Sequence, residues 1–221
     1  MVAAPRSILR VATYNVHGCV GTDGQRSEKR IAEVIASLSA DVVGLQELDA
    51  NRPRSGGVDQ AALIAQALGW QHLFAPALRH GDELYGNAIL SRAPIVLKQV
   101  IDLPGTGSWY CRETRVAIWA ELETALGRVD IINTHFGLGR AERFLQAQLL
   151  AGTVPADRPL VLLGDFNSPA RRRTHRFLAQ SLTDVSAALG QPHAHRTYPT
   201  RFPLVAVDHI FVNAALQPLR I

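Results

Sequence analysis

The chain has 221 residues, the length of one large domain or two small ones. Hydrophobic residues make up 47% of the chain and charged residues 19%, a globular composition that excludes a disordered protein. The longest uncharged apolar stretches run to about eight residues, far short of the roughly 20 that span a bilayer. The net charge of +4 favours an anionic partner only weakly, because genome composition can also enrich arginine over lysine.

Neither a targeting signal nor a disulfide framework is indicated. Residues 1–7 lack the basic and apolar regions of a signal peptide. The two cysteines, Cys19 and Cys111, are too few for a disulfide framework and are expected to be reduced thiols. We therefore expect a cytoplasmic protein without a transmembrane segment, and no feature of the sequence indicates a protein partner.

Short apolar strands and amphipathic helices alternate over the first 75 residues, and strands follow one another over residues 86–135. Strands are expected at Ile8–Asn15, Asp41–Gln46, Ala88–Ser91, Ile95–Ile101, Val116–Glu121, Val129–Thr134, Leu160–Gly164 and Val207–Val212. Helices are expected at Glu28–Leu38, Asp59–Leu68, Ala141–Leu150 and Arg171–Ser181, the last of them capped by Ser168 and Pro169. This order favours a mixed α/β layered structure, and a single domain over residues 1–221 is the simplest interpretation.

Several of these strands end in carboxylates or carboxamides. Asn15 ends the first strand and Glu47 follows the second, where a charge is costly unless it is paired or used. The buried strand at 160–164 leads into Asp165 and Asn167, whose spacing lets both side chains point the same way. Oxygen donors suit Mg²⁺, which keeps several waters and needs only one or two protein carboxylates. The pattern indicates metal-assisted phosphoester hydrolysis, in which an Asp positions or deprotonates water.

Seven short motifs occur in one order between Thr13 and Val212: TYNVHG, LQE, GNAILSR, ETR, NTHFG, GDFNSP and DHIF. Together they resemble the endonuclease/exonuclease/phosphatase superfamily, the metal-dependent phosphoesterases related to deoxyribonuclease I. The resemblance is strongest to small bacterial members of uncharacterised substrate. It implies an α/β (α+β) four-layer sandwich, two packed mixed β-sheets flanked by helices. It also implies a phosphoesterase that uses Mg²⁺ or Mn²⁺.

The resemblance assigns metal or substrate binding to three residues of this sequence and a catalytic role to His135. Glu47 matches the metal-binding glutamate, and Asn15 matches the asparagine beside the metal and the phosphate. His135 matches a histidine that contacts phosphate or acts as a general acid. Arg115 matches a motif position that we expect to contact the substrate.

The resemblance assigns catalytic roles to three further residues. Asp165 and Asn167 match the pair that activates and orients the attacking water, and Asp208 matches an aspartate that orients a catalytic histidine. His209 is not that histidine, because successive residues of a strand face opposite ways. Without its partner, Asp208 is expected to have a raised pKa, or water is expected to fill the site.

The sequence departs from the family pattern at two places. His17 stands where many members carry an aspartate as a second metal ligand. The Ser-Asp-His motif that the family places beyond the DxIF strand does not occur before Ile221. The two explanations are a chain that continues beyond Ile221 and a natural pseudoenzyme. We expect the first, with a C-terminal strand missing here, because a sheet without that strand exposes an unpaired edge.

The sequence thus predicts a divalent-metal-dependent hydrolase of a phosphodiester. Nucleic acid, a phospholipid or inositol phosphate, and a small phosphodiester all remain open as the substrate. A nucleic-acid substrate calls for a continuous basic groove with several phosphate contacts. The alternative function is that of a catalytically impaired domain of the same fold that binds phosphate or nucleic acid.

Overall fold

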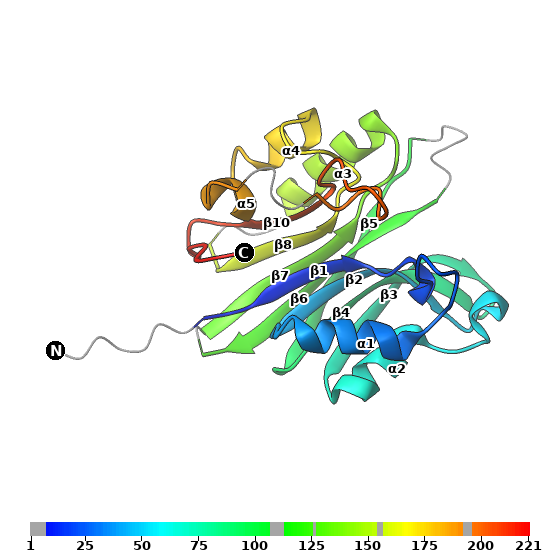
Figure 1. Cartoon of the computed structure of the whole chain (residues 1–221). Coiled ribbons are helices and arrows are strands. Elements are labelled where there is room, and N and C mark those ends of the chain that lie inside the picture. The colour runs from blue at the N-terminus through cyan, green and yellow to red at the C-terminus, as the bar shows by residue number, and fades with distance from the viewer. Residues whose placement is uncertain (1–7, 107–112, 126, 154–156, 192–195) are drawn as a thin grey trace.

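The computed structural model describes residues 8–106, 113–125, 127–153, 157–191 and 196–221. Two β-sheets pack face to face, and helices cover the outer face of each (Figure 1). This arrangement confirms the predicted sandwich of two mixed sheets with flanking helices. Cys19 is buried with a free thiol, whereas Cys111 lies outside the described residues. No helix in the described parts of the chain is long and apolar enough to cross a membrane.

The first sheet has four strands in the order β1-β2-β4-β3. Its strands are β1 (Val11–Asn15), β2 (Val42–Ala50), β3 (Gln71–His80) and β4 (Glu83–Ser91). Only the β1–β2 pairing is parallel, and within the described residues β1 pairs with β2 alone. The short 3-10 helices η1 (His17–Cys19) and η2 (Pro53–Ser55) follow β1 and β2.

Helices α1 (Glu28–Ser37) and α2 (Gln60–Leu68) cover the outer face of the first sheet. The side chains of Ser27 and Asp59 accept backbone N–H bonds at their first turns, as N-caps do. Gly69 ends α2 in the left-handed conformation, with φ of 68°. Both helices begin and end within one residue of the prediction, because these caps are local sequence signals.

The second sheet has six strands in the order β5-β6-β7-β8-β10-β9. They are β5 (Ile95–Leu103), β6 (Arg115–Thr124), β7 (Gly127–His135), β8 (Leu160–Asp165), β9 (Thr183–Asp184) and β10 (Asp208–Val212). The parallel pair β7–β8 is connected through α3 (Arg140–Thr153). Helices α3, α4 (Arg173–Leu178) and α5 (Val185–Ala188) lie on the outer face.

Three elements of the structure were not predicted from the sequence. Strand β3 was not predicted, because its half-buried residues alternate weakly and include Pro76. The short elements β9 and α5 were not predicted either. The prediction that Ser168 and Pro169 cap the fourth helix is wrong. Helix α4 begins after Arg172, which makes no side-chain cap, and Ser168 is buried with its carbonyl accepting a bond from His209.

The two sheets meet in an apolar interface that includes Val42 and Ile89 of one sheet and Ile118, Ile131 and Leu163 of the other. At Gly44 the sheets approach so closely that a Cβ atom would overlap the Leu163 side chain. The interface also holds a polar residue, Asn133 of β7, whose amide bonds the backbone of β2 and β4. The sheets are therefore held in one relative position, which sets the place of the residues at their common edge.

Candidate active site

The predicted site residues converge beside the ends of β1, β7 and β8 and a bulge in β2, with one group from each sheet. Glu47 was expected to follow the second strand, but β2 continues to Ala50 and holds Glu47 at this bulge. Asn15 is the residue that joins the two groups. Its Nδ2 donates to Glu47 Oε1 at 2.7 Å and to Asp165 Oδ2 at 3.1 Å. Strand β1 contacts β8 and β10 across the interface, so one carboxamide reaches a carboxylate from each sheet.

The backbone around Glu47 turns its side chain into this edge. Glu47 has φ of 64°, and the pairing of β2 with β4 shifts register between Leu45 and Leu48. Left-handed backbone at a residue other than glycine and β-bulges are both concentrated at functional sites. His17 also has positive φ, and its Nδ1 lies 3.2 Å from Glu47 Oε2. His17 thus lies beside the glutamate.

His135 is buried at the end of β7 and is held by Arg115. Arg115 Nη1 donates to His135 Nδ1 at 3.2 Å, while its Nη2 pairs with Glu113 Oε2 at 2.8 Å. Because arginine only donates, the proton of a neutral His135 ring lies on Nε2. Burial and the Arg115 charge lower the pKa of His135 to about 3. The ring is a neutral donor, which favours a phosphate contact over a general acid among the roles expected for it.

Asn167 brings a second N–H donor to the same point. Its backbone N–H donates to Asp165 Oδ1 at 2.8 Å, and its Nδ2 donates to the Phe136 carbonyl at 2.8 Å. The same Nδ2 lies 3.2 Å from His135 Nε2. A neutral imidazole accepts at only one nitrogen, so with Arg115 donating to Nδ1 the Nε2–H does not accept from Asn167. Both groups can instead donate to an acceptor that lies beside the pair, such as a phosphate oxygen.

Asp208 and Asp165 lie directly opposite each other on β10 and β8. Burial and the neighbouring Asp165 charge raise the pKa of Asp208 to about 6. Burial also raises the pKa of Asp165, and the Glu47 charge adds to this. The Thr197 hydroxyl hydrogen-bonds the Asp208 carboxylate, but Asp208 Oδ1 is buried without a partner in the described residues. The raised pKa of Asp208 agrees with the prediction.

The donor chemistry at this edge fits a hard divalent cation. Carboxylate oxygens of Glu47 and Asp165 lie 4.0 and 3.8 Å from His135 Nε2, on either side of the Asn15 amide. Mg²⁺ and Mn²⁺ prefer such oxygen ligands and complete their coordination with water. The Glu47 side chain is partly exposed, which leaves room for those waters. His17 offers a nitrogen where many family members offer a second carboxylate.

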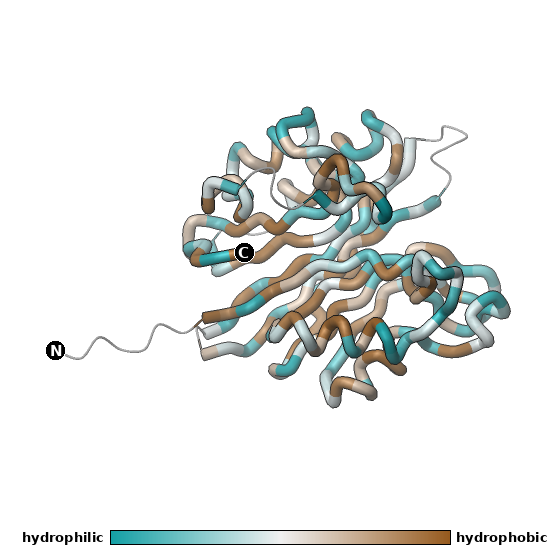
Figure 2. Tube along the Cα trace, viewed as in Figure 1, coloured by the Kyte–Doolittle hydropathy of each residue, from teal (hydrophilic) through white to brown (hydrophobic). Residues whose placement is uncertain are grey.

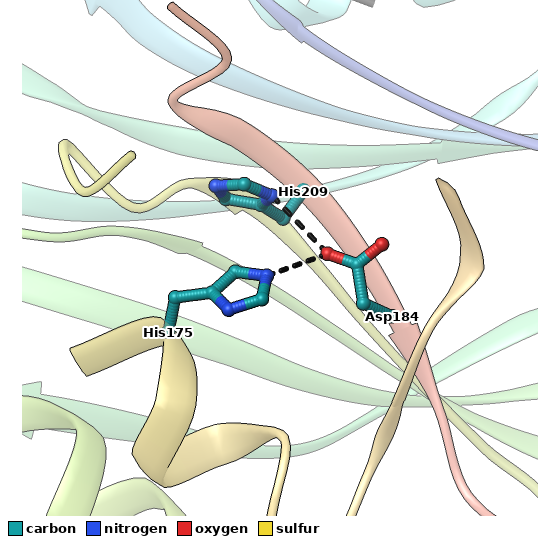
Figure 3. Close-up of side chains that lie close together, drawn as sticks. All are labelled: His175, Asp184 and His209. Carbon is teal, nitrogen blue, oxygen red and sulfur yellow. Dashed lines mark hydrogen bonds and ion pairs between the residues drawn. The ribbon is translucent and has the colours of Figure 1, made fainter. Parts of the chain in front are cut away.

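His175 of α4, Asp184 of β9 and His209 of β10 form a separate buried cluster (Figure 3). Asp184 Oδ2 lies 2.7 Å from His175 Nε2 and 3.5 Å from His209 Nδ1. Despite burial, these imidazoles hold the pKa of Asp184 below its usual range. Nitrogen and oxygen donors of this kind also occur in zinc sites. Hydrogen bonds to the Asp184 carboxylate account for the contacts of both histidines. The cluster therefore connects α4, β9 and β10.

The structure brings together all seven residues that the sequence singled out: Asn15, Glu47, Arg115, His135, Asp165, Asn167 and Asp208. Arg115 reaches the site through its contact with His135. The roles of all seven residues remain predictions. His209 faces away from the site, as predicted. Sequence reasoning missed the contact of Thr197 with Asp208 and the cluster of His175 with Asp184. Thr197, His175 and Asp184 lie outside the seven motifs, so no motif marked these contacts.

Comparison with known proteins gives a match to a family model along most of the chain. The model described as "Endonuclease/Exonuclease/phosphatase family" matches residues 12–221. The "Uncharacterized protein YbhP" of Escherichia coli (strain K12) is 25% identical over 223 residues, which cover 94% of this chain and 85% of that protein.

Two solved structures show the same fold. The endonuclease/exonuclease/phosphatase from Beutenbergia cavernae is 23% identical with a TM-score of 0.73, over 95% of this chain and 65% of that one. The mannosyl-6-phosphatase Bt3783 of Bacteroides thetaiotaomicron is 19% identical with a TM-score of 0.71, over 94% of this chain and 86% of that one.

Proposed function

Because the chain belongs to the endonuclease/exonuclease/phosphatase family, we propose that it is a divalent-metal-dependent phosphodiesterase that hydrolyses its substrate with an activated water. Family members are hydrolytic nucleases and phosphatases, and the solved structures of this fold include a mannosyl-6-phosphatase. We further propose that Mg²⁺ or Mn²⁺ is the metal and that the protein acts in the cytoplasm.

One observation carries the proposal. His135 Nε2 and Asn167 Nδ2 lie 3.2 Å apart, next to the carboxylates of Glu47 and Asp165. Neighbouring donors suit a phosphoryl oxygen, and carboxylates suit a cation and a water proton. An edge with only a structural role is not expected to gather carboxylates in this way, because like charges repel each other.

In this mechanism each side chain has one task. Glu47 and Asn15 would hold the metal, which would supply positive charge to polarise the phosphoryl group. Asp165 accepts the proton of the attacking water, and its raised pKa makes it a better base at neutral pH. His135 and Asn167 donate to phosphoryl oxygens. The water oxygen bonds to phosphorus as its proton passes to Asp165, the ester P–O bond breaks, and the leaving alkoxide takes a proton from bulk water.

Hydrolysis of bis(p-nitrophenyl) phosphate in Mg²⁺, Mn²⁺ or EDTA tests the proposal. We expect turnover with metal and none with EDTA. Asp165→Asn keeps the shape of the side chain but cannot take a proton, so we expect the rate to fall by about 10²–10⁴. Asp102→Asn is the matched control, because Asp102 is exposed on β5. Wild-type turnover in Asp165→Asn contradicts the role given to this residue.

The alternative is a domain that binds phosphate through His135 and Asn167 without hydrolysing it. The same assay separates the two functions. Retention of the aryl phosphodiester without product, with both metals, favours the binding domain. Such a result leaves the donor pair of His135 and Asn167 as an anion site and removes the catalytic role of Asp165.

A further inference from the structure

The loop 196–206 places large apolar side chains in solvent beside the candidate active site. The exposed fractions are 60% for Tyr198, 77% for Phe202 and 65% for Leu204. The loop lies near the α3 label in Figure 1, and Figure 2 shows apolar positions along it. Exposed apolar side chains grouped in this way mark a surface that meets an apolar partner.

The backbone holds this loop in shape without help from those side chains. Tyr198 and Val205 exchange backbone hydrogen bonds of 2.9 and 3.0 Å, and Leu204 donates to the Tyr198 carbonyl at 2.9 Å. Phe202 donates to the Pro199 carbonyl at 3.2 Å. Because the backbone closes the loop, its apolar side chains are left free to contact something else.

Two contacts anchor the loop at the active-site edge. At its start, the Thr197 hydroxyl accepts the Val207 N–H and bonds the Asp208 carboxylate. At its tip, Arg201 Nη2 donates to the Thr22 carbonyl at 3.5 Å, within the segment that follows β1. The loop therefore runs from Asp208 toward the end of the strand that carries Asn15. Leu138, three residues beyond His135, adds another exposed apolar side chain at this edge.

The charge of the loop indicates the nature of the partner. Residues 196–207 contain two arginines, Arg196 and Arg201, and no acidic residue. Arginines beside exposed aromatic and aliphatic side chains match a phospholipid surface, where phosphates lie just outside the acyl region. Bases of single-stranded nucleic acid stack on aromatic rings, which gives the aliphatic Leu204 and Leu138 no role. The aliphatic share of the patch therefore favours lipid.

We propose that the loop 196–206 docks the active site onto an anionic phospholipid surface and that the substrate is a headgroup phosphoester of a lipid in that surface. Docking in this way brings the headgroup phosphate to the edge that carries His135 and Asn167. The substrate part rests on the proposed hydrolysis, whereas docking does not.

Co-sedimentation of the full chain with vesicles in EDTA tests docking in the absence of turnover. We expect the protein to bind vesicles of phosphatidylcholine mixed with phosphatidylglycerol more tightly than phosphatidylcholine alone. The double change Phe202→Ser with Leu204→Ser is expected to weaken binding by at least about tenfold, because two large apolar contacts are lost. Arg201→Gln is expected to weaken binding to the anionic vesicles only.

Val96→Ser is the matched control, because Val96 is 60% exposed on β5, away from the loop. Thermal unfolding checks that each variant is folded. Docking is contradicted if wild type stays in the supernatant, or if the double variant sediments as wild type does. Retention of a single-stranded oligonucleotide instead of vesicles, lost in the double variant, assigns the loop to nucleic acid and also overturns the proposal.

The substrate part is tested by release of headgroup or phosphate from the same vesicles in Mg²⁺. Release that depends on Asp165 supports a lipid substrate. Vesicle binding and aryl phosphodiester hydrolysis without any lipid product overturn the lipid substrate while leaving the phosphodiesterase intact. Loss of all hydrolysis contradicts the proposed function instead, and the EDTA measurement still decides docking.

Discussion

Replacing Asn133 by alanine is expected to destabilise the protein, because this residue clamps the two sheets. Its Nδ2 donates to the carbonyls of Leu45 at 2.9 Å and Ala88 at 2.8 Å, and its Oδ1 accepts from Gln46 Nε2 at 2.7 Å. All three bonds are buried. At about 1 kcal/mol net for each bond, their loss lowers the free energy of unfolding by about 3 kcal/mol. Any carbonyl left unpaired in the interior adds to this loss.

Urea denaturation followed by circular dichroism measures this free energy. We expect Asn133→Ala to lower the midpoint without changing the dependence on denaturant, since the same surface is exposed on unfolding. Gln99→Ala is the control: Gln99 is exposed on β5, where substitutions change stability by no more than about 0.5 kcal/mol. A loss below about 1 kcal/mol in Asn133→Ala refutes the clamp, because the bonds then contribute no more than those to water.

Three further predictions concern carboxylates. Glu47→Gln removes the charge at nearly constant volume, so calorimetric titration should show Mn²⁺ affinity reduced by at least about tenfold in a folded protein. In metal-free protein, NMR should place the Asp208 titration near the pKa of about 6, and Asp165→Asn should lower it by removing the neighbouring charge. The lowered pKa of Asp184 stabilises the fold at neutral pH, and this contribution is lost as pH falls below about 4. The stability difference between wild type and Asp184→Asn should therefore shrink in acid, and a difference independent of pH contradicts the ionised state of Asp184.

Local signals were sufficient for much of the fold. The helical spacing of Ile31, Val34, Ile35 and Leu38 predicted α1, although only Ile31 and Ile35 of these are buried. Asp59 and Gly69 lie at the two ends of α2, as local capping signals predict. Strand β3 was not predicted because its apolar and polar residues alternate only weakly. Pairing with β4 and packing against the opposite sheet stabilise it instead. The prediction that Ser168 caps a helix was wrong because of a tertiary contact. Ser168 is buried, and its carbonyl accepts a hydrogen bond from buried His209.

The sequence by itself determined which residue types stand at the strand ends, and motif order alone was enough to assign the family. The tertiary structure decided what those residues touch. Asn15 and Asp165 are 150 positions apart, and only the packing of two sheets brings their side chains to 3.1 Å. The proton position on His135 likewise follows from Arg115 on a neighbouring strand. Side-chain contacts and protonation depend on neighbours in space, and backbone periodicity carries information only about neighbours along the chain.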